Sequence, residues 1–380
     1  MVDQRASPLH LAFFVPTLAG GGAERVVVTL ANAFAEAGHS VDLFLTSRCG
    51  PQLDLVSPQV SVVDFGRQRT WRAVPTLVET LRRRQPDVLV SGLFSATVAA
   101  YASLAWMQAC GERVPHLCAT VHSPLPRTEV RSVRAHLLVR AARVVLRRIE
   151  TVVAVSQSVA RDLVRHTGRD RGQIDVIHNP IDIGVVQSGA QAPSPHAWFQ
   201  KDVPVVVSAG RLHPQKDHRT LLHALARLQE KDRVRAIILG EGPERKRLEE
   251  QSRELGIFPD TAFPGFVENP YAFMKRADVF ALPSASEAFG NVVVEALACG
   301  TPVVGTESSG GPVEILHTDD ATYGSLVPPH DPAALADALV AVLNRPVDRR
   351  RLQRRARDFD VPEAVERYHA LFERIIRSAS

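Results

Sequence analysis

The stretch DVFALPSASEAFGNVVVEALACGTPVVG, residues 278–305, predicts a strand–loop–helix–strand unit. Residues 279–282 form a short apolar run that is typical of a buried parallel strand, and Pro283 ends this run in a loop of small residues. Asn291 suits the entry of a helix, and Gly300 supplies a stop signal before the next apolar strand. A chain built from such units forms a parallel sheet with helices on both faces.

Two carboxylates lie eight positions apart in this unit. Glu287 precedes the predicted helix and Glu295 lies in its second turn, so both can line one crevice. The backbone N–H groups at the helix start lie between them and favour an anionic or hydroxyl-rich ligand: Phe289, Gly290, Asn291 and Val292. The same carboxylates also fit a structural role, with Glu287 as a capping residue and Glu295 as a solvated helix residue.

Length and composition indicate a globular protein of two domains, since the chain has 380 residues, of which 45% are hydrophobic and 23% charged. No apolar run reaches the length of about 18 residues that a membrane helix needs, and the N-terminal apolar stretch is too short for a signal peptide. We therefore expect a cytoplasmic protein. Four cysteines show neither close pairing nor metal spacing and predict reduced thiols in or near the core: Cys49, Cys110, Cys118 and Cys299.

Charge is unevenly distributed along the chain. Residues 1–190 carry 21 Arg and no Lys against 15 acidic residues, a net charge of +6, whereas the remainder carries 24 basic and 26 acidic residues, a net charge of −2. A basic face can bind nucleic acid, anionic lipid or an anionic small substrate. Because no nucleic-acid module is recognisable and aromatic residues are few, we expect no nucleic-acid partner.

The first half alternates predicted strands with helices, which predicts a doubly wound parallel sheet. The first strand feeds a glycine loop, Gly20–Gly21–Gly22, at the start of an amphipathic helix, where the backbone can approach a ligand or simply make a flexible turn. It is not the dinucleotide fingerprint, because Arg25 stands where the third glycine is needed. The predicted strands span 9–16, 40–46, 60–65, 87–92, 116–121 and 151–155.

The strand HLCATV ends at His122, in the loop HSPLPR. Ligands of open parallel sheets bind at the carboxyl ends of strands, so this histidine can reach a substrate or can be an ordinary surface residue. Residues 127–149 then contain seven arginines among apolar residues. This segment fits two roles equally, a helix packed on the sheet with solvated arginines or an amphipathic helix resting on an anionic membrane.

A segment rich in Ser, Ala, Pro and Gly, residues 183–200, predicts the domain boundary. The second half then restarts the alternation, and its first strand–helix loop carries Arg211 and Lys216. Two cations at a helix start suit a diphosphate, because Arg offers a planar fork and Lys a point charge. Only five lysines occur in the chain, which makes Lys216 hard to explain as an arbitrary surface charge. Further elements are predicted at 204–209, 217–230, 234–240, 243–254, 261–267 and 363–378.

These motifs resemble the retaining GT-B glycosyltransferases of family four. The resemblance covers nearly the whole chain, and the segments that carry it are GGAER (21–25), SAGRLHPQKDHRTLLHAL (208–225), LGEGPER (239–245), FPGFVEN (263–269), SEAFGNVVVEALACGTPVV (286–304) and SSGGPVEIL (308–316). Two departures are Ala288 and Asp217, which stand where the family usually has glycine. The resemblance implies two doubly wound Rossmann-like domains facing across a cleft: 1–185 for the acceptor, 200–360 for the nucleotide sugar, and a helix, 361–380, crossing back.

The resemblance also implies roles for particular residues. Glu287 and His122 contact the transferred sugar, Glu295 holds the ribose, and Arg211 with Lys216 binds the donor diphosphate. Gly21 and Gly22 face the donor phosphates and the acceptor, while Phe266 and Val267 border the base pocket. The implied catalytic residues are His122, Glu287, Arg211 and Lys216; the donor-binding residues are Gly21, Gly22, Arg211, Lys216, Phe266, Val267, Phe289, Gly290, Asn291, Val292 and Glu295.

The implied reaction is transfer of a sugar from a nucleotide diphosphate sugar to a hydroxyl of a glycan or lipid-linked acceptor, with retention at the anomeric carbon. The branch it resembles most builds lipopolysaccharide cores and polysaccharide repeat units from UDP-sugars, which favours an N-acetylhexosamine donor, in the cytoplasm or on the inner face of the plasma membrane. An epimerase or phosphorylase of the same architecture, or a non-catalytic nucleotide-sugar binding protein, are the alternatives.

No cofactor and no metal are expected. The single Asp-x-Asp is Asp358–Phe359–Asp360, which precedes the last predicted helix. Asp360 is better explained there as a helix N-cap than as a metal ligand.

Overall fold

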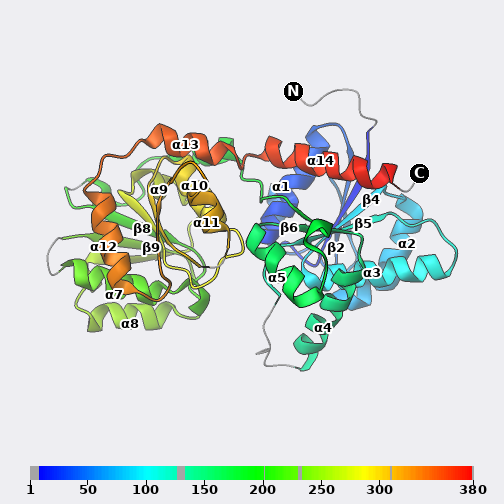
Figure 1. Cartoon of the computed structure of the whole chain (residues 1–380), viewed down its shortest axis with the longest axis horizontal. Coiled ribbons are helices and arrows are strands. Elements are labelled where there is room, and N and C mark those ends of the chain that lie inside the picture. Colours follow the sequence, from blue (N-terminus) through cyan, green and yellow to red (C-terminus); the bar gives the residue numbers. More distant parts are fainter. Residues whose placement is uncertain (1–7, 126–132, 201, 230–232, 309, 379–380) are drawn as a thin grey trace. The chain divides into compact units, whose positions relative to one another are not determined.

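The computed structural model describes residues 8–125, 133–200, 202–229, 233–308 and 310–378. The chain divides into two compact units, and each contains one parallel sheet with helices on both faces (Figure 1). Unit 1 consists of residues 1–180 and 361–380, and unit 2 of residues 181–360. The predicted fold class of two Rossmann-like domains is thereby confirmed.

Unit 1 is built on a sheet with the strand order β3-β2-β1-β4-β5-β6-β7. Adjacent strands pair in parallel, so all seven carboxyl ends lie on one edge. The strands are β1 (His10–Val15), β2 (Ser40–Leu45), β3 (Ser61–Asp64), β4 (Val88–Gly92), β5 (His116–Val121), β6 (Thr151–Ala154) and β7 (Ile174–Val176).

Successive residues of β1 divide between two cores, as the period of two in a strand requires. Leu11, Phe13 and Val15 pack with the core that includes α1 and α14, whereas Ala12 and Phe14 pack with the core that includes α2 and α3. The helices of this unit are α1 (Gly22–Glu36), α2 (Val74–Arg84), α3 (Phe94–Ala109), α4 (Val133–Arg148), α5 (Gln157–Thr167) and α14 (Val361–Arg377), with short 3₁₀ turns η1 (Pro51–Leu55), η2 (Thr70–Ala73) and η3 (Arg171–Gln173).

The last helix completes unit 1. In Figure 1, α14 runs beside α1, and Phe372 of α14 lies 5.7 Å, ring centroid to centroid, from Phe34 of α1. Arg374 also binds both carboxylate oxygens of Asp175 on β7, at 2.7 and 2.8 Å. The chain therefore ends on the same unit in which it begins.

Unit 2 is built on a sheet with the strand order β10-β9-β8-β11-β12-β13, again with parallel pairing throughout. The strands are β8 (Val205–Ala209), β9 (Arg235–Leu239), β10 (Thr261–Gly265), β11 (Val279–Leu282), β12 (Val303–Thr306) and β13 (Ser325–Val327). The stretch 278–305 thus contains β11 and most of β12, two strands that pair with each other.

Two groups of helices accompany this sheet. Helix α7 (His218–Gln229) contacts both α8 (Arg245–Glu254) and α12 (Pro332–Leu343). Helix α10 (Asn291–Ala298) contacts the other group, α6 (Ile183–Ala190), α9 (Tyr271–Arg276), α11 (Gly311–Leu316) and α13 (Arg349–Arg357). The 3₁₀ turns are η4 (Ala197–Gln200), η5 (Pro214–Lys216) and η6 (Phe258–Asp260).

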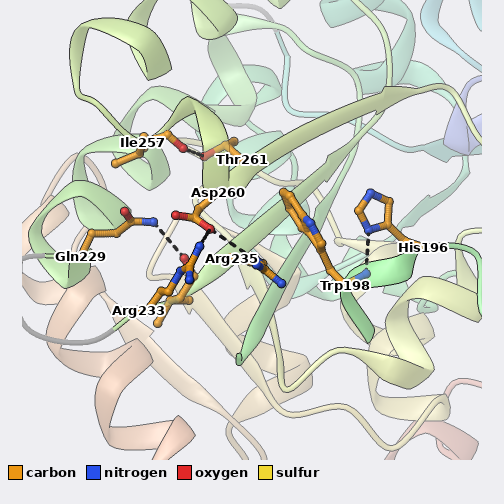
Figure 2. Close-up of polar contacts among 9 residues, drawn as sticks. His196, Trp198, Gln229, Arg233, Arg235, Ile257, Asp260 and Thr261 are labelled. Atoms are coloured by element: carbon orange, nitrogen blue, oxygen red, sulfur yellow. Dashed lines mark hydrogen bonds and ion pairs between the residues drawn. The ribbon is translucent and has the colours of Figure 1, made fainter. Parts of the chain in front are cut away.

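The segment predicted as the domain boundary is packed on unit 2. Helix α6 contacts α9, and Arg276 of α9 donates to the carbonyl oxygen of Ala192 at 2.6 Å. The guanidinium carbon of Arg235 lies 5.2 Å from the ring centroid of Trp198, and Arg235 also binds Asp260 (Figure 2). The units divide between 180 and 181, and not within the predicted boundary of 183–200, because these side chains attach the segment to the second sheet.

The predicted strands agree with the structure in type and within two residues in their bounds, except that the segment DVIHNPID, 175–182, also predicted as a strand, contributes only Asp175 and Val176 to β7. The cysteine prediction was half wrong, since Cys118 and Cys299 are buried but Cys49 and Cys110 are exposed. Burial raises the pKa of the Cys118 thiol, and it raises that of Cys299 to about 12, so both buried thiols stay protonated. Among the helices of the described residues, none combines the length and the apolar character that spanning a membrane requires.

Candidate active site

The residues predicted for the site form two sets, one at the carboxyl edge of each sheet. Gly21 and Gly22 follow β1, and His122 follows β5, in unit 1. In unit 2, the predicted residues follow three strands of the sheet, β8, β10 and β11, and those after β11 continue to the start of α10. The exception is Glu295, which lies in the second turn of α10.

Glu287 is the central acidic residue of unit 2. It lies in the loop between β11 and α10 and is 7% exposed. Its Oε1 accepts hydrogen bonds from Lys216 Nζ at 2.5 Å and from Ser284 Oγ at 2.7 Å. A buried carboxylate needs such partners, because leaving it unpaired would cost several kcal/mol, on the order of 3. The structure therefore brings together the two residues predicted to hold the sugar and the diphosphate.

The loop that carries Lys216 is joined to the Glu287 loop through its backbone. The carbonyl oxygen of Gln215 accepts from the N–H of Ala285 at 2.9 Å, and the Gln215 side chain donates to the carbonyl oxygen of Ser286 at 2.8 Å. Arg211, at the start of the same loop, is exposed; its backbone carbonyl oxygen accepts from the N–H of His213 at 2.8 Å, but its guanidinium has no hydrogen bond or ion pair within the part of the chain that the structure describes. Its guanidinium is thus available for an anionic ligand.

Two glycines of the GEGPER segment support the loop of Arg211 by close approach. A Cβ at Gly240 would lie 1.9 Å from the carbonyl oxygen of Gly210, and one at Gly242 would lie 2.2 Å from that of Leu212. A backbone hydrogen bond also joins the two segments, since the N–H of Leu212 donates to the carbonyl oxygen of Glu241 at 2.8 Å. Only residues without a side chain fit at this distance. The segment therefore positions the Arg211 loop.

The SSGG segment supports the Glu287 loop in the same way. A Cβ at Gly310 would lie 1.6 Å from the carbonyl oxygen of Glu287, and one at Gly311 would lie 2.1 Å from that of Phe289. Gly311 also donates to the carbonyl oxygen of Ala288 at 3.3 Å. These contacts from the start of α11 fix the position of the backbone that carries Glu287.

Helix α10 begins as the sequence predicts, with Asn291 as its first residue. Gly290 precedes it with φ 89°, a left-handed conformation that favours glycine. The Phe289 side chain is buried, with its ring 5.6 Å from that of Phe359, so only its backbone could face a ligand. Glu295 and Val292 are half-buried on α10.

The loop after β10 presents an aromatic side chain to solvent. Phe266 is 74% exposed, whereas its neighbour Val267 is half-buried. The end of β10 is held by Arg245, which donates to the carbonyl oxygen of Phe263 at 2.7 Å and bonds the carboxylate of Glu241. An exposed ring on a braced loop is a suitable stacking surface for a planar ligand.

In unit 1, the glycine loop is braced by η1. Gly21 is the N-cap of α1, and its carbonyl oxygen accepts from Gln52 Nε2 at 3.1 Å. The Glu24 carboxylate lies over Gly21, since a Cβ there would be 2.1 Å from Glu24 Oε2. Gly22 is the first residue of α1 and is exposed.

His122 directly follows β5 and is half-buried. Its Nε2 lies 3.0 Å from Thr120 Oγ1, which in turn donates to the carbonyl oxygen of Ser91 at 3.1 Å. Burial lowers the pKa of His122 to about 4, against a smaller opposing effect of hydrogen bonding to Asn179. His122 is therefore neutral at pH 7 and can offer a hydrogen bond, but not a positive charge, to a ligand.

Both carboxylates of the Asp-x-Asp are engaged with the protein. Asp358 accepts from Arg355 at 2.8 Å, and Asp360 accepts from the N–H of Ile183 at 3.3 Å. The latter contact joins the two ends of unit 2, and Asp360 also directly precedes α14, where the sequence predicted a helix cap.

Sequence reasoning missed the side chains that hold the predicted residues in place. Ser284 and Gln215 fix the Glu287 loop, and His330 binds Asp217, the residue after Lys216, at 2.7 Å. The sequence held one signal for the contact between His330 and Asp217: Asp217 stands where the resembled family usually has glycine. Together, the site of unit 2 offers two cations, a helix start and a buried carboxylate, which can bind a phosphorylated, hydroxyl-rich ligand.

Comparison with known protein families gives two matches. A model for glycosyl transferases group 1 matches residues 195–359, and a model for glycosyltransferase family 4 matches residues 20–185. The first covers most of unit 2 and the second covers most of unit 1, so the two together span the greater part of the chain.

Individual relatives are similar over part of their length. A D-inositol 3-phosphate glycosyltransferase from Mycolicibacterium smegmatis is 35% identical over 205 residues, 52% of this chain and 46% of that protein. From Campylobacter jejuni, an N-acetylgalactosamine-N,N'-diacetylbacillosaminyl-diphospho-undecaprenol 4-alpha-N-acetylgalactosaminyltransferase is 30% identical over 215 residues, 56% of each chain. The chain thus spans about half the length of these relatives.

A solved structure shares the whole fold. HepE from Anabaena, in complex with UDP-glucose, has a TM-score of 0.81 at 23% identity, covering 96% of this chain and 99% of that one. The family models, the relatives and this shared fold agree with the resemblance seen in the sequence motifs. The chain belongs to the GT-B glycosyltransferases of family four.

Proposed function

We propose that this protein transfers a sugar, with retention at the anomeric carbon, from a UDP-sugar to a hydroxyl of a glycan or lipid-linked acceptor in cell-surface polysaccharide or lipopolysaccharide synthesis. The donor sugar is an N-acetylhexosamine. The observation that carries this proposal is the contact of Lys216 with the buried Glu287, next to the exposed Arg211, at the carboxyl edge of the second sheet. This contact supports the proposal, because an ammonium group that can bind phosphate lies beside a carboxylate that can bind hydroxyl groups.

The comparisons support the choice of donor. The Anabaena neighbour was solved with UDP-glucose, which favours a uridine nucleotide. The Campylobacter relative is named as an N-acetylgalactosaminyltransferase acting on a diphospho-undecaprenol glycan, which favours an N-acetylhexosamine and a lipid-linked acceptor. The Mycolicibacterium relative is named for D-inositol 3-phosphate, so that compound is the competing acceptor.

In the proposed complex, Lys216 and Arg211 bind the diphosphate, Glu287 binds sugar hydroxyls, and Glu295 holds the ribose. Phe266 and Val267 border the base. Gly21, Gly22 and the backbone from 289 to 292 face the donor, and neutral His122 donates a hydrogen bond to the sugar. No carboxylate acts as a covalent nucleophile: the leaving phosphate takes the acceptor proton as the glycosidic bond forms on the same face. The protein contributes positioning and charge stabilisation.

The direct test is to incubate the purified protein with UDP-, GDP- and ADP-sugars and measure nucleotide release, first alone and then with lipid-linked glycan or D-inositol 3-phosphate. Slow release of UDP from UDP-N-acetylhexosamine, accelerated by the lipid-linked glycan, is the expected result. Product that retains the donor's anomeric configuration supports retention. Formation of free sugar isomers would instead identify an epimerase, and cleavage that requires phosphate would identify a phosphorylase. Binding of UDP without turnover would identify a non-catalytic binding protein.

We also propose that no divalent metal is needed. Arg211, Lys216 and the start of α10 supply positive charge where a metal ion would otherwise offset the diphosphate. Turnover should therefore continue in the presence of a chelator. Loss of turnover with chelator and recovery with magnesium or manganese would contradict this.

Helix α4 is the proposed contact with an anionic membrane. Leu137 and Val144 are 60% and 52% exposed on this helix, and Arg140, Arg147 and Arg148 are exposed beside them. Exposed apolar residues flanked by cations suit the interface of an anionic bilayer. Arg127 and Arg131 of the predicted arginine segment lie outside the described residues. We expect the protein to co-sediment with vesicles that contain phosphatidylglycerol but not with vesicles of pure phosphatidylcholine. The variant Leu137→Glu/Val144→Glu should lose this co-sedimentation.

A further inference from the structure

Two residues next to the nucleotide site adopt a backbone conformation that favours glycine. Asp217 has φ 45° and His330 has φ 61°. A left-handed conformation is unfavourable for a residue with a side chain, although Asp and His tolerate it better than most. The two residues are 113 positions apart, yet His330 Nδ1 lies 2.7 Å from Asp217 Oδ2. The chain thus keeps two strained positions whose side chains bind each other.

The Asp217 carboxylate joins three elements of unit 2. It follows η5 directly, and it accepts from the N–H and Oγ1 of Thr220 at 3.4 and 2.7 Å, which secures the start of α7. Through His330, it is also tied to the loop in front of α12, a helix that packs along α7. That loop is itself fixed, because Asp331 caps α12 through the N–H groups of Ala333 and Ala334.

Lys216 lies between this clamp and the Glu287 loop. On one side Asp217 fixes the backbone that follows it, and on the other side Gln215 bonds the backbone of Ala285 and Ser286. Its side chain passes close to Gly210, where a Cβ would lie 3.5 Å from Lys216 Cε. We propose that Asp217 and His330 act as a pair of positioning residues that aim the Lys216 ammonium at the donor diphosphate.

This proposal rests on the nucleotide-binding role proposed above for Lys216, but one test needs no nucleotide. With only five lysines in the chain, acylation of Lys216 by an N-hydroxysuccinimide ester can be followed by mass spectrometry, with exposed Lys246 as the internal reference. His330→Gly removes the contact and relieves the strain at that position. Lys216 should then react severalfold faster relative to Lys246, because its ammonium is held less firmly on Glu287.

UDP affinity gives the second readout. His330→Gly should weaken UDP binding about threefold to fivefold, the range for an exposed, charge-assisted hydrogen bond. Asp217→Asn should stay near wild type, because the amide oxygen can still accept from Thr220 Oγ1 and His330 Nδ1, the two shorter contacts, and Asn tolerates the left-handed backbone. Gln85→Gly is the matched control, since Gln85 has φ 47° at the end of α2 in unit 1, and it should change neither readout.

A positioning role also predicts non-additivity. In the Lys216→Met/Glu287→Gln background, which removes both charges of the pair together, His330→Gly should have no further effect on UDP affinity, whereas a merely structural loss would persist. An unchanged Lys216 reactivity in His330→Gly would overturn the proposal, as would an undiminished effect in that background. A wild-type protein that fails to bind UDP would contradict the proposed function instead, and the acylation test would still decide the positioning role.

Discussion

At the scale of single residues, the Lys216–Glu287 pair decides how the site responds to mutation. Lys216→Met should lower UDP affinity about ten- to a hundredfold, because a charge-assisted contact to phosphate contributes roughly 1.5–3 kcal/mol. It should also lower the free energy of unfolding by about 3 kcal/mol, since the buried Glu287 carboxylate loses its counter-charge. Calorimetric titration with UDP and urea unfolding measure the two effects.

The control is the double variant Lys216→Met/Glu287→Gln, which replaces both charges. Stability should recover most of its loss, because no unpaired charge remains buried, whereas UDP affinity should stay low. Recovery of UDP affinity together with stability would mean that Lys216 serves the fold and does not bind phosphate.

Substitutions of the two carboxylates of the site should change different kinetic parameters. In the proposed reaction, Glu287 contacts the sugar that becomes cationic in the transition state, so Glu287→Gln should lower kcat with little effect on UDP affinity. Glu295 holds the ribose, which does not change, so Glu295→Gln should mainly raise the donor KM. UDP titration separates them, because UDP has a ribose but no transferable sugar. Loss of UDP binding in Glu287→Gln alone would reverse the two assignments.

At the scale of elements, close contacts between loops set the geometry of the site. Gly240→Ala should push the Gly210–Leu212 loop away, because the added Cβ would lie 1.9 Å from the Gly210 carbonyl oxygen. The expected loss of stability is about 3 kcal/mol, with a raised donor KM, because Arg211 moves with its loop. Gly256→Ala is the matched control.

Gly256 also has a positive φ, +71°, but nothing lies within 4 Å of the position of an added Cβ. This variant should show only the backbone cost, about 1 kcal/mol, and an unchanged donor KM. Equal effects of the two substitutions on stability and KM would show that the contact with Gly210 has no role in placing Arg211.

At the scale of the whole molecule, buried histidines should make stability depend on pH. Burial is the main cause that lowers the pKa of four histidines. The pKa falls to about 4 for His122 and His218; in addition to burial, His369 lowers the pKa of His39 and Arg235 lowers the pKa of His196. The unfolded chain binds protons to these groups near pH 6.5, whereas the folded chain does not. Their contribution is therefore complete above about pH 6.5 and is lost as the pH falls toward 4.

At pH 5, His122 and His218 should each reduce the free energy of unfolding by about 2 kcal/mol relative to pH 7.5. The two lie in different units, so both units should lose stability. Urea unfolding at the two pH values measures the difference, and His218→Gln should make the drop smaller by about 2 kcal/mol. An equal drop in wild type and His218→Gln would show that this histidine is not buried in its neutral form.

Much of the fold followed from local patterns. Apolar runs predicted the strands, because residues of a parallel sheet are buried on both faces, and Gly290 with Asn291 marked the start of α10. The composition of residues 183–200 predicted the domain boundary there, but Trp198 and Phe199 pack on unit 2. Composition cannot show this, since the partners, Arg235 and Phe273, are distant in the chain.

Sequence patterns were enough to predict the parallel α/β architecture, the loops that carry the predicted residues and the chemical type of each residue there. The contacts of Lys216 with Glu287, of Asp217 with His330 and of Gly240 with Gly210 became visible only in the folded chain. The physical reason is the difference in range. Strand and helix patterns arise from neighbours a few residues apart, whereas each of these contacts joins loops that meet only because the sheet brings the carboxyl ends of its strands to one edge.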